Sequence, residues 1–203
     1  VLFRSPQDLK WEDRLDNPEI GDPNAKKGGV LRQWAPGSYP DTFRPNGPNS
    51  NSGFRGPLYD EIIIGLVSIH PVTGKIIPGI AHKWAESPDR RTVYFELDPD
   101  ARYTDGAKVK AIDLLVNMYI RTSEYSQDVF YNNFFYQNAS NITIYDDSRF
   151  SITLPFAKPL LPYYCTLFIP SPPHFYCEFG PNYVERYQWR IPPTTGDRKS
   201  TRL

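Results

Sequence analysis

Residues 92–124, TVYFELDPDARYTDGAKVKAIDLLVNMYIRTSE, decide the fold of this chain. At the start of the stretch, Val93, Phe95 and Leu97 alternate with residues that point to the opposite face, which predicts a half-buried strand over 92–97. Its end, 111–124, has the three- and four-residue spacing that is typical of an amphipathic helix. The residues with this spacing are Ile112, Leu115, Met118, Tyr119 and Thr122. A strand that is followed along the chain by a helix favours a mixed α+β fold.

The segments on either side add short antiparallel elements. Residues 67–69 and 75–77 flank a turn and predict one hairpin, and residues 142–145 and 150–154 predict another. A short strand over 30–34 and a short helix over 58–66 are also expected. Between them, residues 35–56 are rich in proline, glycine and asparagine, which predicts a long loop of the kind that often carries function.

Composition bounds the possible functions. A length of 203 residues and a hydrophobic content of 39% are enough for one ordinary domain, or two small ones, with a real core. The 21 prolines predict few long helices and many turns. Lys+Arg and Asp+Glu balance at 23 each, which disfavours a nucleic-acid binder, because such proteins need a clustered positive face. No apolar run is long enough to cross a bilayer.

No catalytic or metal-binding motif stands out. Cys165, His174 and Cys177 are too few for a structural zinc site, which needs four ligands. A Cys165–Cys177 disulfide and two unpaired thiols both remain open. The acidic pairs 60–61 and 146–147 are adjacent in sequence, so their side chains are expected to point apart and not to act as an acid/base pair. We therefore predict no catalytic residue, no metal site and no cofactor.

The two terminal segments of the chain differ in their sequence from the part between them. Residues 1–5, VLFRS, and residues 197–203, DRKSTRL, resemble the translation of the two strands of a short sequencing adapter. A natural polar tail is the alternative. On the adapter interpretation, the chain divides into adapter-like residues 1–5, an irregular lead-in over 6–28, a partial domain over 29–196 and adapter-like residues 197–203.

An ordered series of short motifs resembles one protein family over about 170 residues. In chain order the motifs are KGGVL (27–31), PDTFRP (40–45), LYD (58–60), IPGIAHKW (77–84), YFEL (94–97), YTDG (103–106) with AID (111–113), PHFY (173–176) and PTTG (193–196). Each motif is weak alone, but their order and spacing resemble the family 5 extracellular solute-binding proteins, in the branch of oligopeptide and microcin C receptors. One departure is Lys110, which stands where the family usually has a Thr or Ser helix cap.

This resemblance implies a fold and a function. The fold would be the N-terminal lobe of a two-lobed, type II-like periplasmic clamshell, truncated before the second lobe. The function would be the capture of oligopeptides or peptide-like solutes for an ABC importer, outside the cytoplasmic membrane and without catalysis. The implied partners are the permease subunits with their separate ATPase, and the implied membrane association is through that permease or a lipid anchor.

The resemblance also assigns roles to particular residues. The residues expected to contact the ligand are Ser38, Tyr39, Thr42, Phe43 and Tyr59. The residues expected to serve folding are Trp84, Asp105, Gly106 and Asp113. Two other readings remain open: a secreted carbohydrate-binding or adhesion β domain, which would have no helix over 111–124, and a secreted hydrolase fragment, which would need a convergent acid/base pair.

Overall fold

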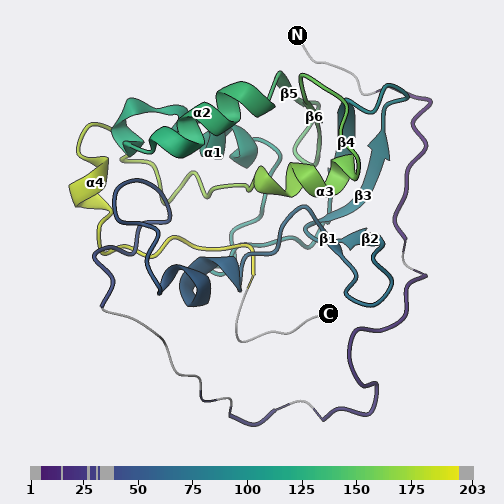
Figure 1. The fold of residues 1–203 in the computed structure, drawn as a ribbon, viewed down its shortest axis with the longest axis horizontal. Coiled ribbons are helices and arrows are strands. Elements are labelled where there is room, and N and C mark those ends of the chain that lie inside the picture. Colours follow the sequence, from purple (N-terminus) through teal and green to yellow (C-terminus); the bar gives the residue numbers. More distant parts are fainter. Residues whose placement is uncertain (1–5, 15, 27, 31, 33–38, 197–203) are drawn as a thin grey trace.

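A computed structural model describes residues 6–14, 16–26, 28–30, 32 and 39–196. A four-stranded antiparallel sheet lies at one end of the molecule and a pair of helices at the other (Figure 1). The fold is mixed α and β, as the sequence predicts. The predicted strand over 30–34 cannot be compared, because residues 31, 33 and 34 lie outside the described ranges.

The sheet is the centre of the main core. Its strand order is β3 (Ala81–Glu86), β4 (Thr92–Leu97), β6 (Arg149–Thr153) and β5 (Asn141–Ile144). The predicted strand over 92–97 is confirmed residue for residue, and its Val93, Phe95 and Leu97 are all buried. Phe95 pairs with Phe150 across the sheet, and the two rings stack at 5.4 Å. This contact favours the observed register, because a slip of either strand by one residue would turn that strand's ring out of the core.

Both predicted hairpins are present. The β5–β6 hairpin lies within one residue of its expected position. The smaller hairpin joins β1 (Val67–Ile69) to β2 (Ile76–Pro78). After β2 the chain passes so close to an earlier segment that a Cβ on Gly79 would meet the carbonyl oxygen of Gly65. Only glycine leaves room for that approach.

The predicted helix over 111–124 is present as α1 (Asp113–Thr122), followed by the 3₁₀ turn η2 (Glu124–Ser126). No side chain caps α1 at Ile112, but Asp113 accepts a hydrogen bond from the Lys110 backbone N–H at 3.0 Å. This bond is the half of a capping box that the residue three positions after the cap makes to the N–H of the cap position, so the bond that is missing is the one from a Thr or Ser side chain at position 110.

The buried face of α1 differs from the one that the apolar spacing indicates. The buried residues are Asp113, Leu114, Asn117, Ile120 and Arg121. Ile112, Leu115 and Tyr119 are instead 46%, 37% and 60% exposed. The polar contacts of Asp113 with Tyr103 and Lys110 account for the difference, because they hold the helix with its polar side toward the interior.

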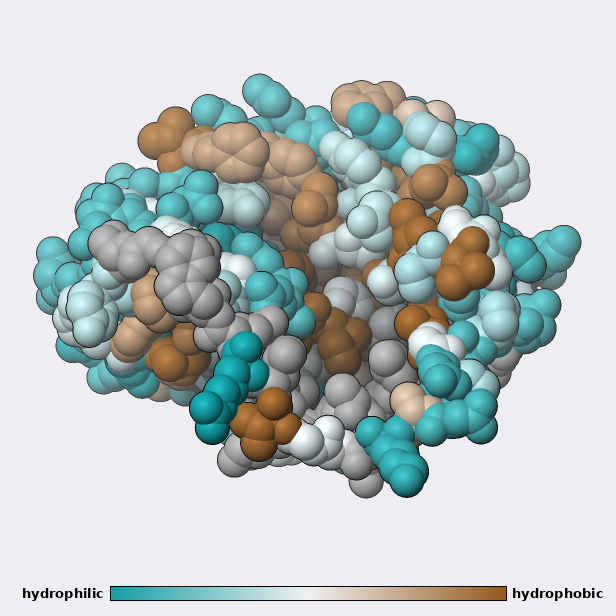
Figure 2. All heavy atoms as spheres, turned by 60° about the horizontal axis from the view of Figure 1, so that its bottom comes forward, coloured by the Kyte–Doolittle hydropathy of each residue, from teal (hydrophilic) through white to brown (hydrophobic). Residues whose placement is uncertain are grey.

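The second long helix, α2 (Val129–Asn138), packs beside α1. It begins at Asp128, whose side chain accepts a hydrogen bond from the Tyr131 N–H at 3.2 Å. Phe135 is buried against Phe168, with ring centroids 5.1 Å apart. Val129 and Phe130 remain exposed, and Figure 2 shows that apolar side chains form several separate groups on the face it displays.

Short turns complete the described chain. In place of the helix predicted over 58–66, one π-helical turn, η1 (Gly56–Asp60), is present. The remaining helical elements are α3 (Leu161–Tyr164), η3 (Cys165–Leu167) and α4 (Tyr183–Arg186). A second, aromatic core forms where Tyr176, Tyr183 and Tyr187 pack on Ile120 of α1. Cys165 is buried and Cys177 exposed, and both are free thiols, so the Cys165–Cys177 disulfide does not form.

The lead-in contributes one contact to the sheet. Glu12 forms an antiparallel bridge with Trp84 on the edge strand β3, with N–H to O distances of 2.8 and 3.0 Å. The backbone of the edge strand is therefore partly paired. In the described part of the chain, no helix has the length and apolar character needed to cross a membrane.

Candidate functional site

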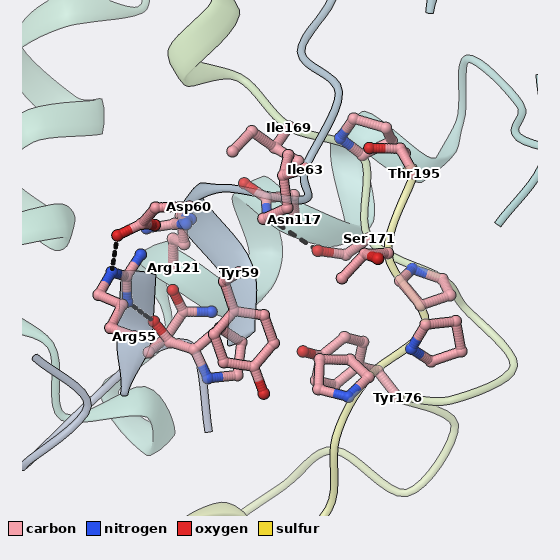
Figure 3. A pocket seen from close by; sticks show the side chains of 17 residues that line it. Arg55, Tyr59, Asp60, Ile63, Asn117, Arg121, Ile169, Ser171, Tyr176 and Thr195 are labelled. Carbon is pink, nitrogen blue, oxygen red and sulfur yellow. Dashed lines mark hydrogen bonds and ion pairs between the residues drawn. The ribbon is translucent and has the colours of Figure 1, made fainter. Parts of the chain in front are cut away.

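Arg55 lines two hollows, and both are also lined by residues of the predicted long loop and of a helix. The smaller hollow has a volume of about 60 Å³ and is walled by η1, α1 and the segments 169–172 and 192–195 (Figure 3). The larger hollow has a volume of about 410 Å³ and lies between the loop and the start of α2. Its lining residues are Gly47, Asn49, Ser50, Asn51, Arg55, Asp128, Phe130 and Tyr131.

The sizes of the hollows limit what each can hold. Pockets for drug-sized ligands measure roughly 300–1,000 Å³, so the larger hollow could take part of a ligand of that size. The smaller hollow has room for about two water molecules, or for one functional group of similar size. Because Arg55 lines both, a ligand seated in the larger hollow lies next to the smaller one.

The loop that forms one wall is held by two arginines. Arg44 donates from Nη1 to the carbonyl of Asn46 at 2.8 Å and from Nη2 to that of Pro48 at 3.0 Å. Arg55 donates from Nη1 to the carbonyl of Pro45 at 2.5 Å. The Gly47 N–H donates to Asp128 Oδ2 at 2.9 Å, which ties the loop to α2. These bonds fix residues 44–48 in place, as a preformed site requires.

The lining of the smaller hollow carries two arginines, Arg55 and Arg121, and one carboxylate, Asp60. Arg55 Nε lies 3.2 Å from Asp60 Oδ2, and this ion pair is partly exposed. Arg121 is only 5% exposed, and its burial lowers the pKa of its guanidinium. Burial also raises the pKa of the Tyr59 phenol, so Tyr59 stays neutral and can only donate or accept a hydrogen bond.

The predicted ligand contacts are placed in different surroundings. Ser38 lies outside the described residues, and Tyr39 is 92% exposed. Thr42 is only 4% exposed, and its hydroxyl donates to the Gln188 carbonyl at 2.8 Å. Phe43 packs edge-on against Trp189, with ring centroids 5.5 Å apart. Tyr59 lines the smaller hollow and donates its hydroxyl proton to the Phe43 carbonyl, so it alone of the four described residues reaches a hollow.

The residues expected to serve folding lie away from both hollows. Trp84 is buried in the main core. Asp105 and Gly106 form a turn in which Asp105 Oδ1 accepts the Ala107 N–H at 3.0 Å, and Gly106 has a φ of +89°. Asp105 Oδ2 also lies 2.6 Å from His174 Nε2. Asp113 is buried and accepts the Tyr103 hydroxyl proton at 2.9 Å.

The polar residues of α1 that line the smaller hollow were not among the expected contacts. Asn117 and Arg121 are one turn apart on the buried face. The signal that could have indicated them is a pair of polar residues at i and i+4 in a helix with apolar side chains on several sides. The same hollow also receives Ser171 and Tyr176, which come from irregular segments and have no periodicity to reveal them.

The arrangement is suited to binding and not to acid/base chemistry. Each hollow is lined by a single carboxylate, Asp60 in the smaller and Asp128 in the larger. Asp128 accepts hydrogen bonds from the backbone N–H groups of Gly47 and Tyr131 through its two oxygens. Across the described ranges, no three His, Cys, Asp or Glu side chains converge to hold a metal ion.

Comparison with known families gives a match at residues 75–199, more than half of the chain. The matching family is described as "Bacterial extracellular solute-binding proteins, family 5 Middle". Among curated proteins, the chain is similar to a "Probable ABC transporter-binding protein" of Deinococcus radiodurans. The two are 28% identical over 116 residues, which is 55% of this chain and 19% of that protein.

Solved structures show the same fold. A dipeptide-binding protein from Pseudoalteromonas sp. SM9913, in complex with Met-Leu, matches 77% of this chain and 34% of its own, with a TM-score of 0.59 and 18% identity. Haemophilus influenzae OppA, in complex with RPPGFSPFR, matches 74% of this chain and 32% of its own, with a TM-score of 0.57 and 20% identity. NikZ from Campylobacter jejuni, in complex with Ni(L-His), matches 66% of this chain and 26% of its own, with a TM-score of 0.51 and 23% identity. This chain therefore matches about a quarter to a third of the length of such structures.

Proposed function

Because the chain belongs to the bacterial extracellular solute-binding proteins of family 5, we propose that it is part of the substrate-binding component of an ABC importer. In this role it captures a peptide or peptide-like solute outside the cytoplasmic membrane and delivers it to permease subunits, whose separate ATPase supplies the energy. The observation that carries this proposal is the family match over 75–199, together with the shared fold. Association with the membrane is through the permease or a lipid anchor.

Residues 29–196 act as one lobe of a two-lobed clamshell in this proposal. Support comes from the extent of the structural likeness, which covers about three quarters of this chain and about a third of the related structures. Ligand binding is then a shift from open to closed arrangements of two lobes. The groups of exposed apolar side chains on the face in Figure 2 are consistent with contacts to other parts of such a protein.

A peptide is the ligand we favour. Two of the structurally similar proteins are described with peptides, Met-Leu and RPPGFSPFR. An extended peptide is held mainly through its backbone, so a site for it needs fixed polar groups and roomy side-chain pockets. The larger hollow offers room, and the loop 44–48 offers fixed polar groups.

The expected contact residues take two roles in this proposal. Tyr39, with its side chain largely free, contacts the ligand directly, as does Ser38 beside it in sequence. Thr42, Phe43 and Tyr59 hold the loop in position for that contact, because their polar groups are used in bonds to Gln188 and to one another.

The rival functions receive less support. An adhesion or carbohydrate-binding domain made only of strands does not contain α1, which the structure has at Asp113–Thr122. A hydrolase needs a convergent acid/base pair, and each hollow is lined by one carboxylate. A nickel complex or an opine remains a specific alternative. NikZ is described with Ni(L-His), and a further structurally similar protein, AgaA of A. tumefaciens R10 (TM-score 0.53, 22% identity), is described with agropinic acid.

Calorimetric titration of the protein in its full natural length tests the proposal. The panel holds di-, tri- and nonapeptides, nickel with histidine, and agropinic acid. We expect micromolar or tighter binding for at least one peptide class and none for the other solutes. Binding of nickel–histidine or the opine alone would keep the solute-binding role and reject the peptide.

A further inference from the structure

The first two residues of α2 are both exposed apolar residues, but only the second lines a hollow. Val129 and Phe130 are 72% and 71% exposed. Phe130 lines the larger hollow, of about 410 Å³, and Val129 does not. Aromatic side chains are common in the walls of ligand pockets, where part of their surface stays open until the ligand arrives. Phe130 is therefore a candidate ligand contact, and Val129 beside it is not.

The ring of Phe130 is oriented by its neighbours on the helix. Its centroid lies 5.2 Å from that of Tyr131, with the two planes at 82°, and 6.5 Å from that of Phe134, with the planes at 19°. Tyr131 is in turn covered by Arg121, whose guanidinium lies 4.0 Å from the centroid of the Tyr131 ring. A ring that is already oriented loses little side-chain freedom when a ligand stacks on it. Phe130 thus provides a preorganised, flat apolar surface.

The loop side of the larger hollow is polar and carries no charge of its own. It is formed by Asn49, Ser50 and Asn51. Among the described residues, these three side chains make no hydrogen bond, and Asn49 and Asn51 are exposed, so their amides are available to a ligand. The bond from the Gly47 N–H to Asp128 at 2.9 Å holds this loop against the start of α2 (Figure 1). The apolar and the polar side of the hollow are therefore kept together.

The charged groups that line the larger hollow already have partners. Arg55 forms an ion pair with Asp60 at 3.2 Å. Asp128 uses one oxygen for the Gly47 N–H at 2.9 Å and the other for the Tyr131 N–H at 3.2 Å. Arg55 and Asp128 also have opposite charges, so the lining has no net charge. A neutral group fits this hollow better than an ion, because an ion would have to replace one of these partners.

We propose that the larger hollow receives one side chain of the transported peptide and selects a neutral aromatic residue with a hydrogen-bonding edge, above all tyrosine. The tyrosine ring stacks on Phe130, and its hydroxyl bonds to the side chains of residues 49–51. A phenylalanine of the peptide offers the ring alone, and a leucine offers neither a flat face nor a polar edge. This inference deepens the proposed function and rests on it, since it takes the solute to be a peptide.

The experiment uses the protein in its full natural length and nine tripeptides. Tyrosine, phenylalanine or leucine replaces each residue of trialanine in turn, and the affinities are measured by calorimetry. At one of the three positions we expect the tyrosine peptide to bind about 3- to 10-fold more tightly than the leucine peptide, as the gain from a stacked ring pair implies. The phenylalanine peptide should lie between the two.

Variants of Phe130 and of the loop separate the two contacts. Phe130→Leu keeps an apolar side chain without a flat ring, so it should lower the affinity for the tyrosine peptide to that for the leucine peptide, whereas Phe130→Trp should keep the preference. The double variant Ser50→Ala/Asn51→Ala should lower the affinity for the tyrosine peptide to that for the phenylalanine peptide. Val129→Ala is the matched control, because Val129 is equally exposed and does not line the hollow. Circular dichroism confirms that each variant is folded.

N-acetyltyrosinamide provides an arm that does not depend on peptide binding, because it has no charged terminus. At millimolar concentration it should raise the unfolding midpoint of the wild type and of Val129→Ala, and N-acetylleucinamide should not. Neither compound should raise the midpoint of Phe130→Leu. If no tripeptide binds while N-acetyltyrosinamide still acts through Phe130, the peptide function fails and the aromatic pocket stands.

Three results would overturn the proposal. The first is that the tripeptides bind without a preference for tyrosine at any position, or with a preference that survives in Phe130→Leu. The second is that no tripeptide binds and N-acetyltyrosinamide has no effect. The third is that methyl glucoside raises the unfolding midpoint through Phe130 while N-acetyltyrosinamide does not, which would assign the hollow to a sugar.

Discussion

The bond between Tyr103 and Asp113 offers a quantitative test of how α1 is anchored. Asp113 is 2% exposed, and its Oδ2 accepts both the Tyr103 hydroxyl proton at 2.9 Å and the Lys110 N–H at 3.0 Å. Replacement of Asp113 by Ala leaves both donors without a partner. Replacement of Tyr103 by Phe removes one donor and leaves the bond to Lys110 intact.

The expected magnitudes follow from these contacts. A hydrogen bond to a charged group contributes about 1.5–3 kcal/mol, so the two bonds of Asp113 would be worth about 3–6 kcal/mol. Burial raises the pKa of Asp113, which means that its ionised form is penalised in the folded state. We therefore take the low end, about 3 kcal/mol for Asp113→Ala and about 1.5 kcal/mol for Tyr103→Phe.

The assay is thermal unfolding followed by circular dichroism, with the two single variants and the double variant. For a chain of this size, 1 kcal/mol corresponds to about 2–4 °C, so Asp113→Ala should lower the midpoint by about 6–12 °C. The double variant should cost about 3 kcal/mol and not the sum, because the shared bond is lost only once. Asp147→Ala is the control, since its exposed carboxylate pairs only with the Lys110 side chain and its loss should be hard to detect.

Simple additivity would refute this reasoning. If the cost of the double variant equals the sum of the single costs to within about 0.3–0.5 kcal/mol, Tyr103 and Asp113 are not coupled. The polar anchoring of α1 would then have another origin.

Three further predictions concern a close approach, acid stability and the buried arginine. Gly196→Ala should lower the free energy of unfolding by about 3 kcal/mol, because the added Cβ would collide with the Ile62 carbonyl. Gly180→Ala is the control: no atom lies within 4 Å of the added Cβ, so its free energy of unfolding in denaturant should not change. Burial acts to raise the pKa of Asp146, but hydrogen bonds from Ser148 and Arg149 outweigh it and lower the pKa to about 2. The stability that this depressed pKa provides is present above the unfolded value near 3.8 and is lost as the pH falls from there to about 2. Asp146→Asn should therefore flatten that part of the pH–stability curve, and a slope equal to that of the wild type would contradict the prediction. Arg121→Met should stabilise the ligand-free protein by about 1–4 kcal/mol in the same unfolding assay, and a loss of stability would show that its charge is compensated.

Local patterns predicted the sheet better than the helices. The alternation of Val93, Phe95 and Leu97 fixed a strand and its buried face, because the side-chain period of a strand is unambiguous. The hairpins followed from turns between short apolar runs. In contrast, α1 has apolar residues on several sides, so spacing indicated a helix but not its buried face. That face was decided by long-range polar contacts, such as those of Tyr103 with Asp113.

The helix α2 illustrates a second limit. Its sequence, VFYNNFFYQN, is made of weak helix formers, and aromatic residues occur on all sides. Only the cap at Asp128 marks its start. Since the larger hollow lies at this start, the sequence could not reveal the site that α2 helps to form. The loop on the opposite wall was predicted as functional from its composition alone, and that remains a prediction.

The pairing of Thr42 and Phe43 with Gln188 has a consequence for synthesis of the chain. These bonds join residues 146 and 145 positions apart, and Thr195 similarly bonds to the Ile64 carbonyl across 131 positions. At a translation rate of about 5–20 residues per second, roughly 7–30 s pass between the appearance of Thr42 and that of Gln188. During this interval the wall of the smaller hollow that contains residues 192–195 does not yet exist. The newly made chain therefore cannot hold a solute at this site until its last described residues have left the ribosome.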